Sequence, residues 1–350
     1  MKARLCVLIL SLSLVLNALG AAAKQPSAGS RTGELEAAFQ QVQNVQLVGQ
    51  IGGITRAVAV QGDFATIGVG PRLVILDISN PDLPAVVGKT ATLPHEVSGV
   101  ALDGNRAYVA DGYGGLRIID LSDPTAPIEV GFYDTPGNAY HLALSGNYAY
   151  VADDVGGLRV IDVSDPAAPT QAGFYDTPGT ARGVALSGNY AYVADGNAFR
   201  VIDISDPAAP TQAGFYDTPG FSEAVALAGN RAYITIWHGL RIVDVSDPTA
   251  PTEVGYFDMP GPARGLALAG DYAYISNADR GLRIIDVSGP GRPSEVGFFN
   301  TPGSAVGVAL TGNLAYVADR NTGLRIIDIT DAANTSEVGF YDMPSSAIDV

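Results

Sequence analysis

Few residues of this 350-residue chain could carry out catalysis or hold a metal ion. It contains three histidines, His95, His141 and His238, and one cysteine. An acid such as Glu223, together with a neighbouring side chain, could act as a general acid and base. However, the sequence has no Gly-x-Ser-x-Gly elbow, no His-x-x-x-His pair and no complete Gly-x-x-x-x-Gly-Lys-Ser/Thr phosphate loop. These absences favour a protein that is not an enzyme.

A different kind of chemistry is indicated by residues 236–239, which read Ile-Trp-His-Gly. Trp237 is the only tryptophan, and His238 follows it in what we expect to be a loop. An exposed indole is a natural platform for stacking a sugar or an anchor for a protein partner. Packing of the indole against an adjacent part of the same protein is the alternative that the sequence leaves open.

These residues stand within a long internal repeat. The phrase Gly-Asn-x-Ala-Tyr-Val-Ala-Asp recurs with variations, and its first glycine falls at Gly62, Gly104, Gly146, Gly188, Gly229, Gly270 and Gly312. Successive copies are therefore 41 or 42 residues apart. A period of this length is typical of propeller blades and of helical solenoids, so the pattern inside one copy must distinguish them.

One copy reads as four short strands. Small residues at 183–186 lead through a Gly-Asn turn into the aromatic and branched segment 190–194, which predicts a hairpin. Segments 199–204 and 212–217 follow, separated by Asp-Pro breaks. The sequence therefore predicts an all-β fold, a β-propeller of about seven four-stranded blades that occupies residues 47–350. Residues 47–51 read as one surplus outer strand and 347–350 as one further inner strand, so the closure of the ring is left open.

Positions that differ between otherwise uniform copies are free to serve function. The residue just before each first strand varies in charge and size, and the seven are Arg56, Ser98, Tyr140, Arg182, Glu223, Arg264 and Val306. First strands surround the central channel of a propeller, so we expect these side chains to line its mouth. The predicted binding residues are Trp237, His238, Glu223, Tyr140, Arg182, Arg264 and Arg56.

Positions that recur serve the blades instead. One aspartate recurs in all seven copies and is expected to cap its following turn: Asp77, Asp120, Asp162, Asp203, Asp244, Asp286 and Asp328. An arginine recurs in six and is expected to stack on tyrosines of the neighbouring strand: Arg117, Arg159, Arg200, Arg241, Arg283 and Arg325. Further acids are expected to form an acidic rim, namely Asp111, Asp153, Asp195 and Asp319 together with Asp134, Asp176 and Asp217 of the Asp-Thr-Pro-Gly turns. These acids are spread one per blade, so we predict no cofactor and keep Ca²⁺ only as an alternative.

The amino terminus has the pattern of an export signal. Lys2 and Arg4 precede an apolar run at 5–19 and the small residues 20–23. We therefore predict a signal peptide at 1–23 and a linker with a short helix near 34–43 within residues 24–46. The net charge of −16 becomes −18 once these two basic residues are removed. Such a charge repels nucleic acid, and no apolar span for membrane insertion remains after the signal.

The third strand and its exit, Leu-Arg-Val-Ile-Asp-Val-Ser-Asp-Pro-Ala-Ala-Pro at 158–169, together with Tyr-Ala-Tyr-Val-Ala-Asp at 148–153, resemble the LVIVP-repeat proteins. This resemblance implies an exported bacterial or archaeal propeller and carries no shared reaction or catalytic motif. The first copy departs from it, because residues 73–77 lack the arginine and Val69 replaces the aspartate.

The sequence thus leads to one functional hypothesis and two rivals. We expect a secreted or cell-surface, non-enzymatic propeller that binds a protein or glycan of the cell envelope through its channel mouth and one loop face. A structural spacer within a larger envelope array is the first alternative. A metal-dependent propeller hydrolase or lactonase is the second.

Overall fold

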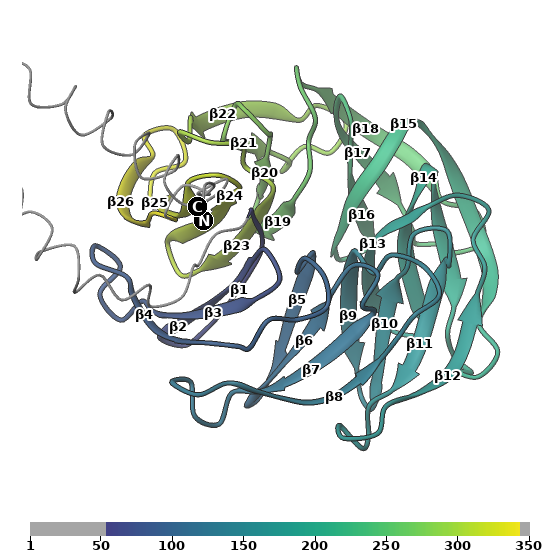
Figure 1. Cartoon of the computed structure of the whole chain (residues 1–350). Helices are drawn as coiled ribbons and strands as arrows, with labels where there is room; N and C mark the ends of the chain where they lie inside the picture. Colours follow the sequence, from purple (N-terminus) through teal and green to yellow (C-terminus); the bar gives the residue numbers. More distant parts are fainter. Residues whose placement is uncertain (1–53, 344–350) are drawn as a thin grey trace, which may run out of the picture. The chain divides into compact units, whose positions relative to one another are not determined.

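The computed structural model describes residues 54–343, and all regular structure in this range is β-strand. Consecutive strands pair antiparallel into sheets, and the sheets follow one another around a ring in sequence order (Figure 1). The chain is therefore a β-propeller. The predicted signal peptide, linker helix and terminal segments 47–51 and 347–350 lie outside the described residues.

Five of the sheets have four strands each. The first contains β1 (Thr55–Gln61), β2 (Phe64–Val69), β3 (Leu73–Asp77) and β4 (Ala85–Lys89). The second contains β5 (Gly99–Asp103), β6 (Arg106–Ala110), β7 (Leu116–Asp120) and β8 (Ile128–Tyr133). The third contains β9 (His141–Ser145), β10 (Tyr148–Ala152), β11 (Leu158–Asp162) and β12 (Thr170–Tyr175).

The last two sheets of the ring have the same form. One contains β19 (Leu266–Ala269), β20 (Tyr272–Ser276), β21 (Leu282–Asp286) and β22 (Ser294–Phe299). The other contains β23 (Gly307–Thr311), β24 (Leu314–Asp319), β25 (Gly323–Asp328) and β26 (Ser336–Tyr341).

The remaining sheet has six strands, so the expectation of about seven separate four-stranded blades is corrected to six hydrogen-bonded sheets. It contains β13 (Ala181–Ser187), β14 (Tyr190–Asp203), β15 (Thr211–Ala228), β16 (Arg231–Ile236), β17 (Gly239–Asp244) and β18 (Thr252–Asp258). The physical reason is that β14 and β15 are 14 and 18 residues long and continue where the other repeats have loops. The pair Gly196 and Ser222 joins the two strands at this point, and the Ser222 hydroxyl donates to the Gly196 carbonyl oxygen at 2.8 Å.

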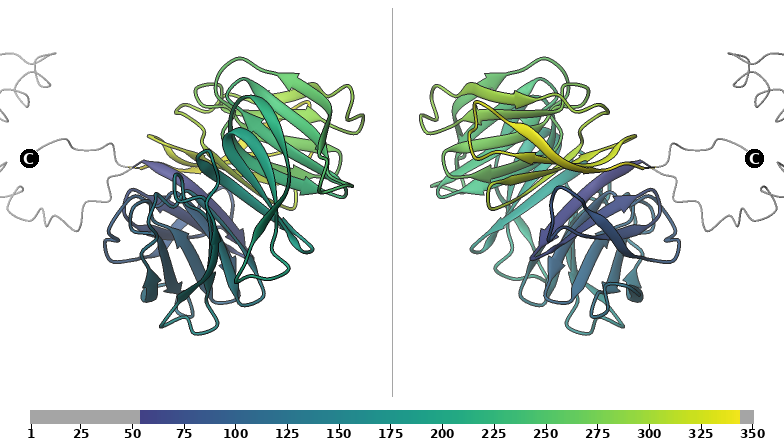
Figure 2. Two further views of the ribbon diagram at one scale, coloured as in Figure 1. Left: turned by 90° about the vertical axis from the view of Figure 1, so that its right-hand side faces the viewer. Right: turned by 90° about the vertical axis from the view of Figure 1, so that its left-hand side faces the viewer.

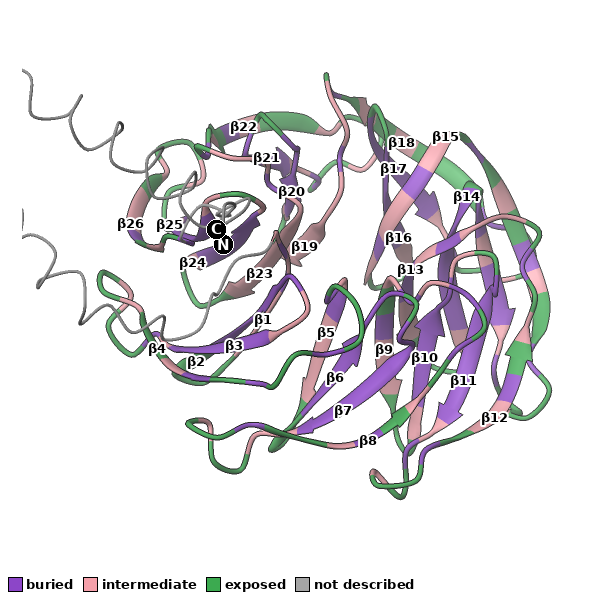
Figure 3. Cartoon of the chain, viewed as in Figure 1, coloured by how far each residue is buried: buried purple, intermediate pink, exposed green. Residues whose placement is uncertain are grey.

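The order of burial within a sheet follows the position of each strand. The second and third strands are almost entirely buried, the first are half-buried, and the fourth present alternate side chains to solvent (Figure 3). The core lies between neighbouring sheets, where Val, Ile, Leu and Tyr side chains of one sheet pack on those of the next. This arrangement leaves the loops and the channel-facing ends of the first strands free to vary.

The recurring Gly-Asn turn is required by backbone geometry. Gly188, between β13 and β14, has φ 56°, and the other six repeat glycines also have positive φ. Residues with a Cβ rarely adopt this conformation, whereas glycine adopts it without steric cost. The glycine spacing that reveals the repeat therefore marks the tight turn of each first hairpin.

The first and last sheets close the ring by packing against each other (Figure 2). Val74 and Leu76 share one core cluster with Leu324 and Ile326. The backbone N–H of Thr55 donates to the Arg320 carbonyl oxygen at 2.9 Å. Both sheets are built from consecutive strands, so closure within residues 54–343 does not use an exchanged strand.

Candidate functional site

The seven recurrent aspartates cap the turns that follow the third strands, as predicted. In each copy the carboxylate accepts the backbone N–H of the residue two positions later, at 2.7 to 2.9 Å. At Asp77, hydrogen bonding to the side chain of Ser79, together with this backbone bond, holds the pKa of the carboxyl below its ordinary value. These residues serve the framework.

The recurrent arginines also serve the framework, although their stacking partners differ from the prediction. Each guanidinium lies over an aromatic ring on the fourth strand of its own repeat, at 4.5 to 5.6 Å from the ring centroid; five of these rings are phenylalanines and one is a tyrosine. Arg159, for example, is the cross-strand partner of Phe174 and also pairs with the exposed Asp176 at 2.8 Å. The sequence identified stacking on a neighbouring strand, but it named tyrosines where five of the six partners are phenylalanines.

The expected acidic rim is corrected in part: the turn residues Asp134, Asp176 and Asp217 are exposed, whereas the other four acids are buried under the loops. Asp111, Asp153 and Asp319 are each 0% exposed, and Asp195 is 1% exposed. Asp153 shows why: it accepts the Thr135 hydroxyl and the Gly137 N–H, the latter at 2.8 Å, from the turn of the preceding repeat. Asp195 and Asp319 hold equivalent turns in the same way. These acids are internal clamps between repeats.

Asp111 is the incomplete member of this set. Its Oδ2 accepts the His95 backbone N–H at 3.1 Å, while its Oδ1 is buried without a hydrogen-bond partner. Burial raises its pKa from 3.8 to about 7, although Arg117, at 3.7 Å, opposes this. The folded pKa lies above the unfolded value, so this group's contribution to stability is present below pH 4 and is lost as the pH rises toward 7.

We predict that Asp111→Asn removes this loss, because the amide resembles the protonated acid. The difference in free energy of unfolding between wild type and variant should shift by about 2 kcal/mol between pH 5 and pH 8, in favour of the variant at high pH. Urea unfolding at both pH values measures this difference. Asp77→Asn is the control, since that carboxyl has a lowered pKa and should add no slope above pH 5. Parallel curves for wild type and Asp111→Asn would refute the assignment.

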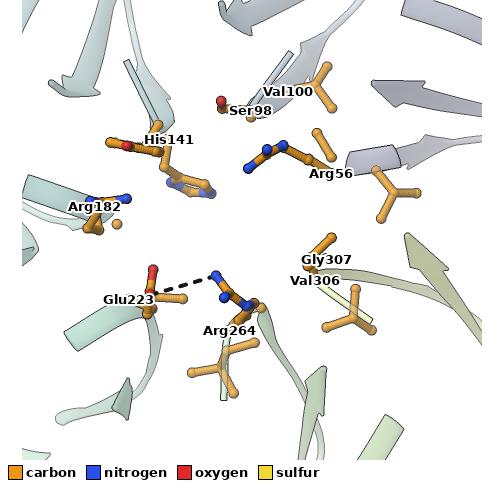
Figure 4. Close-up of a pocket in the computed structure, with 18 of the residues that line it drawn as sticks. Arg56, Ser98, Val100, His141, Arg182, Glu223, Arg264, Val306 and Gly307 are labelled. Atoms are coloured by element: carbon orange, nitrogen blue, oxygen red, sulfur yellow. Dashed lines mark ion pairs between the residues drawn. The ribbon is translucent and has the colours of Figure 1, made fainter. Parts of the chain in front are cut away.

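The variable residues before the first strands all line one cavity, at the centre of the ring (Figure 4). The cavity has a volume of about 280 Å³. Its lining includes all seven: Arg56, Ser98, Tyr140, Arg182, Glu223, Arg264 and Val306. The predicted convergence of these residues is thus observed, whereas their role in binding stays a prediction.

Several charged side chains lie in the wall of this cavity. Arg182 lies 3.8 Å from the centroid of the Tyr140 ring and 3.7 Å from the Asp154 carboxylate. Arg264 pairs with Glu223 at 3.9 Å, the contact drawn in Figure 4. Arg56 pairs at 2.9 Å with Glu96, which belongs to the loop leading to β5.

Two titratable groups in the cavity are shifted toward their neutral forms. Burial raises the pKa of Glu223, and Arg264 and Arg182 only partly oppose it. His141 keeps exposed surface inside the channel, but the surrounding protein lowers the pKa of its imidazole. The cavity therefore contains a carboxyl and an imidazole that could exchange protons with a ligand.

Trp237 lies in the loop between β16 and β17, outside the cavity but on the same face of the ring. It is 53% exposed and stacks on His238, with ring centroids 6.4 Å apart. Its backbone N–H donates to the Phe221 carbonyl oxygen at 3.0 Å, and the Phe221 ring lies 5.4 Å from the Arg182 guanidinium. A continuous path of contacts thus links this loop to the channel mouth.

Sequence reasoning missed one cationic residue of the cavity, Arg320. It directly follows Asp319 at the end of β24, and the equivalent positions in other repeats are held by Trp237 and Gly112. The comparison of repeats that selected the channel residues would have found it if applied to this loop. A Gly-Lys-Thr tripeptide at 88–90 also occurs, but it ends an outer strand, and the Thr90 hydroxyl accepts the Leu73 N–H.

Neither a metal centre nor a membrane span is found in the part of the chain that is described. Residues 54–343 contain no group of three or more His, Cys, Asp or Glu side chains arranged to hold a metal ion. No helix within this range has the length and apolar character needed to cross a bilayer.

The fold and the recurrent side chains define a repeat-built β-propeller, and the family follows from the sequence match. The LVIVD repeat matches seven times, at residues 52–92, 95–135, 136–177, 178–218, 219–259, 260–301 and 302–343. The chain therefore belongs to the LVIVD-repeat family, in agreement with the resemblance drawn from residues 148–169. No curated protein matches the chain.

Solved structures similar to this chain share its fold at low sequence identity. A putative 6-phosphogluconolactonase from Bacteroides fragilis is 14% identical, with a TM-score of 0.68 over 83% of this chain and 95% of that chain. The periplasmic gluconolactonase PpgL of Pseudomonas aeruginosa is 15% identical, with a TM-score of 0.63 over 78% and 88%. The Cps50 (Swd1) β-propeller domain of Myceliophteria thermophila is 15% identical, with a TM-score of 0.64 over 80% and 98%. These similarities extend to the fold alone.

Proposed function

We propose that this chain is an exported, non-enzymatic binding module that holds a protein or glycan of the cell envelope at its channel mouth and adjoining loop face. The observation that carries the proposal is the gathering of the seven variable side chains around one cavity, within a framework whose other positions repeat. The exposed Trp237 and His238 on the same face enlarge this surface with aromatic area that stacks on sugars or anchors a peptide. The export signal predicted at 1–23 supports the location.

We further infer that the ring contains seven blade-sized modules, with the six-stranded sheet counting as two. The support is a glycine of each fourth strand, beside which a Cβ would come within 1.7 to 2.5 Å of a backbone oxygen in the next repeat. There are seven such contacts, from Gly88 against Pro124 to Gly339 against Pro81 in the first repeat. These seven equivalent contacts between repeats imply seven modules, each of which places one first strand beside the channel.

The experiment that tests the proposal compares binding of wild type and Trp237→Ala/His238→Ala to an array of envelope glycans and to an envelope protein extract. We expect the double variant to lose at least tenfold in affinity, because removing an exposed aromatic anchor costs more than about 1.4 kcal/mol. Its melting temperature should stay within about 2 °C, since both side chains lie on the surface. Leu83→Ala, at a 74% exposed position on the opposite face, is the matched control. Unchanged binding by the double variant would refute the loop as part of the site.

A lactone-hydrolysing enzyme is the second candidate function. Glu223 and His141 line one cavity with pKa values displaced in opposite directions, an arrangement that suits general acid–base work. Two similar folds bear lactonase names. Hydrolysis of glucono-1,5-lactone above the uncatalysed rate by wild type, lost in Glu223→Gln, would favour this candidate over the binding module.

A further inference from the structure

Three arginines from three consecutive repeats meet on one side of the channel. Arg56 belongs to β1, Arg264 directly precedes Gly265 and β19, and Arg320 follows β24. All three line the same cavity, and Figure 4 shows the guanidinium groups of Arg56 and Arg264 pointing into it. Val306, the variable residue of the repeat between them, contributes no compensating acid.

These guanidinium groups are incompletely satisfied. The Nε atoms of Arg56, Arg264 and Arg320 are buried and have no hydrogen-bond partner among residues 54–343. The framework arginines Arg159 and Arg325 also have unpartnered Nε atoms, but each of these faces a buried aspartate at 3.8 to 4.0 Å. No such ion pair is found at the Nε atoms of the three channel arginines within the described range. Each of these three guanidinium groups therefore has one donor that no protein group in the described range satisfies.

The three charges also repel one another. The pKa of Arg320 is lowered first by burial and then by Arg56 and Arg264, while Glu96 and Asp279 act in the opposite direction. Arg320 forms no ion pair within 4.0 Å in the described part of the chain. Arg56 and Arg264, by contrast, have acid partners in Glu96 and Glu223. An anion bound beside Arg320 would supply the counter-charge that this guanidinium lacks among the described residues.

We infer that Arg56, Arg264 and Arg320 form a binding site for a small ligand that carries a carboxylate or phosphate group, such as an acidic sugar. This inference rests on the proposed binding function and names the class of ligand that the channel takes. Arginine matches both oxyanions through paired N–H donors, so the shared chemistry is the charged oxygen pair. A volume of 280 Å³ holds on the order of ten waters, which suits a small molecule or one terminal sugar and not a folded segment.

Isothermal titration of the purified protein with citrate, glucuronate, inorganic phosphate and neutral glucose tests the inference. We expect at least one anion to bind at least tenfold more tightly than glucose, and Arg320→Gln to weaken that binding by tenfold or more. Preference for citrate and glucuronate assigns a carboxylate ligand, and preference for inorganic phosphate assigns a phosphate ligand. Equal, weak binding of all four compounds would overturn the inference.

Two further readouts separate a binding role from a structural one. Arg320→Gln should leave the melting temperature unchanged or raise it, because it relieves repulsion, and its backbone bond to Thr55 remains. Arg106→Gln, which removes an equal charge at an exposed position outside the cavity, should leave anion binding unchanged. Equal loss of binding in both variants would show a general charge effect and overturn the inference. A ligand from the envelope array whose binding is lost in Trp237→Ala/His238→Ala gives the final comparison. If Arg320→Gln binds that ligand as tightly as wild type, the inferred ligand class is wrong while the proposed binding function stands.

Discussion

Replacement of Asp153 by alanine should lower the free energy of unfolding by about 3 to 5 kcal/mol, the largest loss we expect from a single side chain. The substitution leaves the Thr135 hydroxyl and the Gly137 N–H buried without an acceptor. It also removes the acid that faces Arg159 at 3.8 Å, so a mostly buried guanidinium loses part of its compensation. Urea unfolding at pH 7 followed by circular dichroism measures the loss.

Asp176→Ala is the matched control for this prediction. Asp176 binds the same arginine at the shorter distance of 2.8 Å, but its side chain is 65% exposed. An exposed ion pair contributes at most about 1 kcal/mol, so this variant should unfold close to wild type. Equal losses of stability in Asp153→Ala and Asp176→Ala would show that the burial of Asp153 is not what stabilises the contact between the two repeats.

Substitution of Gly339 by alanine should cost about 3 kcal/mol, because this glycine forms the joint between the last repeat and the first. An added Cβ would lie 1.8 Å from the Pro81 carbonyl oxygen, so one of the two backbones must shift. Overpacking of this kind typically costs 1 to 3 kcal/mol, and a backbone neighbour places it at the upper end. Thermal unfolding measures the loss.

Two other glycine substitutions serve as controls for the loss of stability expected in Gly339→Ala. Gly289→Ala meets no atom within 4 Å and should change stability by less than about 0.5 kcal/mol. Gly297→Ala meets the Ala332 oxygen at 1.7 Å within the ring and should cost as much as Gly339→Ala. A loss at Gly297 without a comparable loss at Gly339 would contradict a closed ring.

The features that the sequence could predict are those that repeat or vary at one fixed position. The spacing of the glycines located the hairpins, because each tight turn requires a positive φ that glycine adopts without steric cost. The difference between Arg56, Glu223 and Val306 at equivalent positions located the channel mouth, since strand order alone brings these positions together.

What the sequence could not predict depends on contacts between repeats. Asp153 looks like a surface turn residue until the preceding Thr135 turn folds over it. The continuity of β14 and β15 depends on a pairing between Gly196 and Ser222, which are 26 residues apart. Arg320 is a different case, because the repeats could have been compared at its loop, and only the structure shows that it lines the cavity.

The measurement that tests the central claim most directly is binding to the envelope glycan and protein array by Val306→Trp, a variant that fills the cavity without removing a charged group. The account predicts that binding falls at least tenfold, while Leu83→Trp on the opposite face binds as wild type does. Both variants should unfold within about 1 kcal/mol of each other in urea, which shows that the ring remains intact. Full binding by Val306→Trp would contradict the claim that the channel mouth is the functional site.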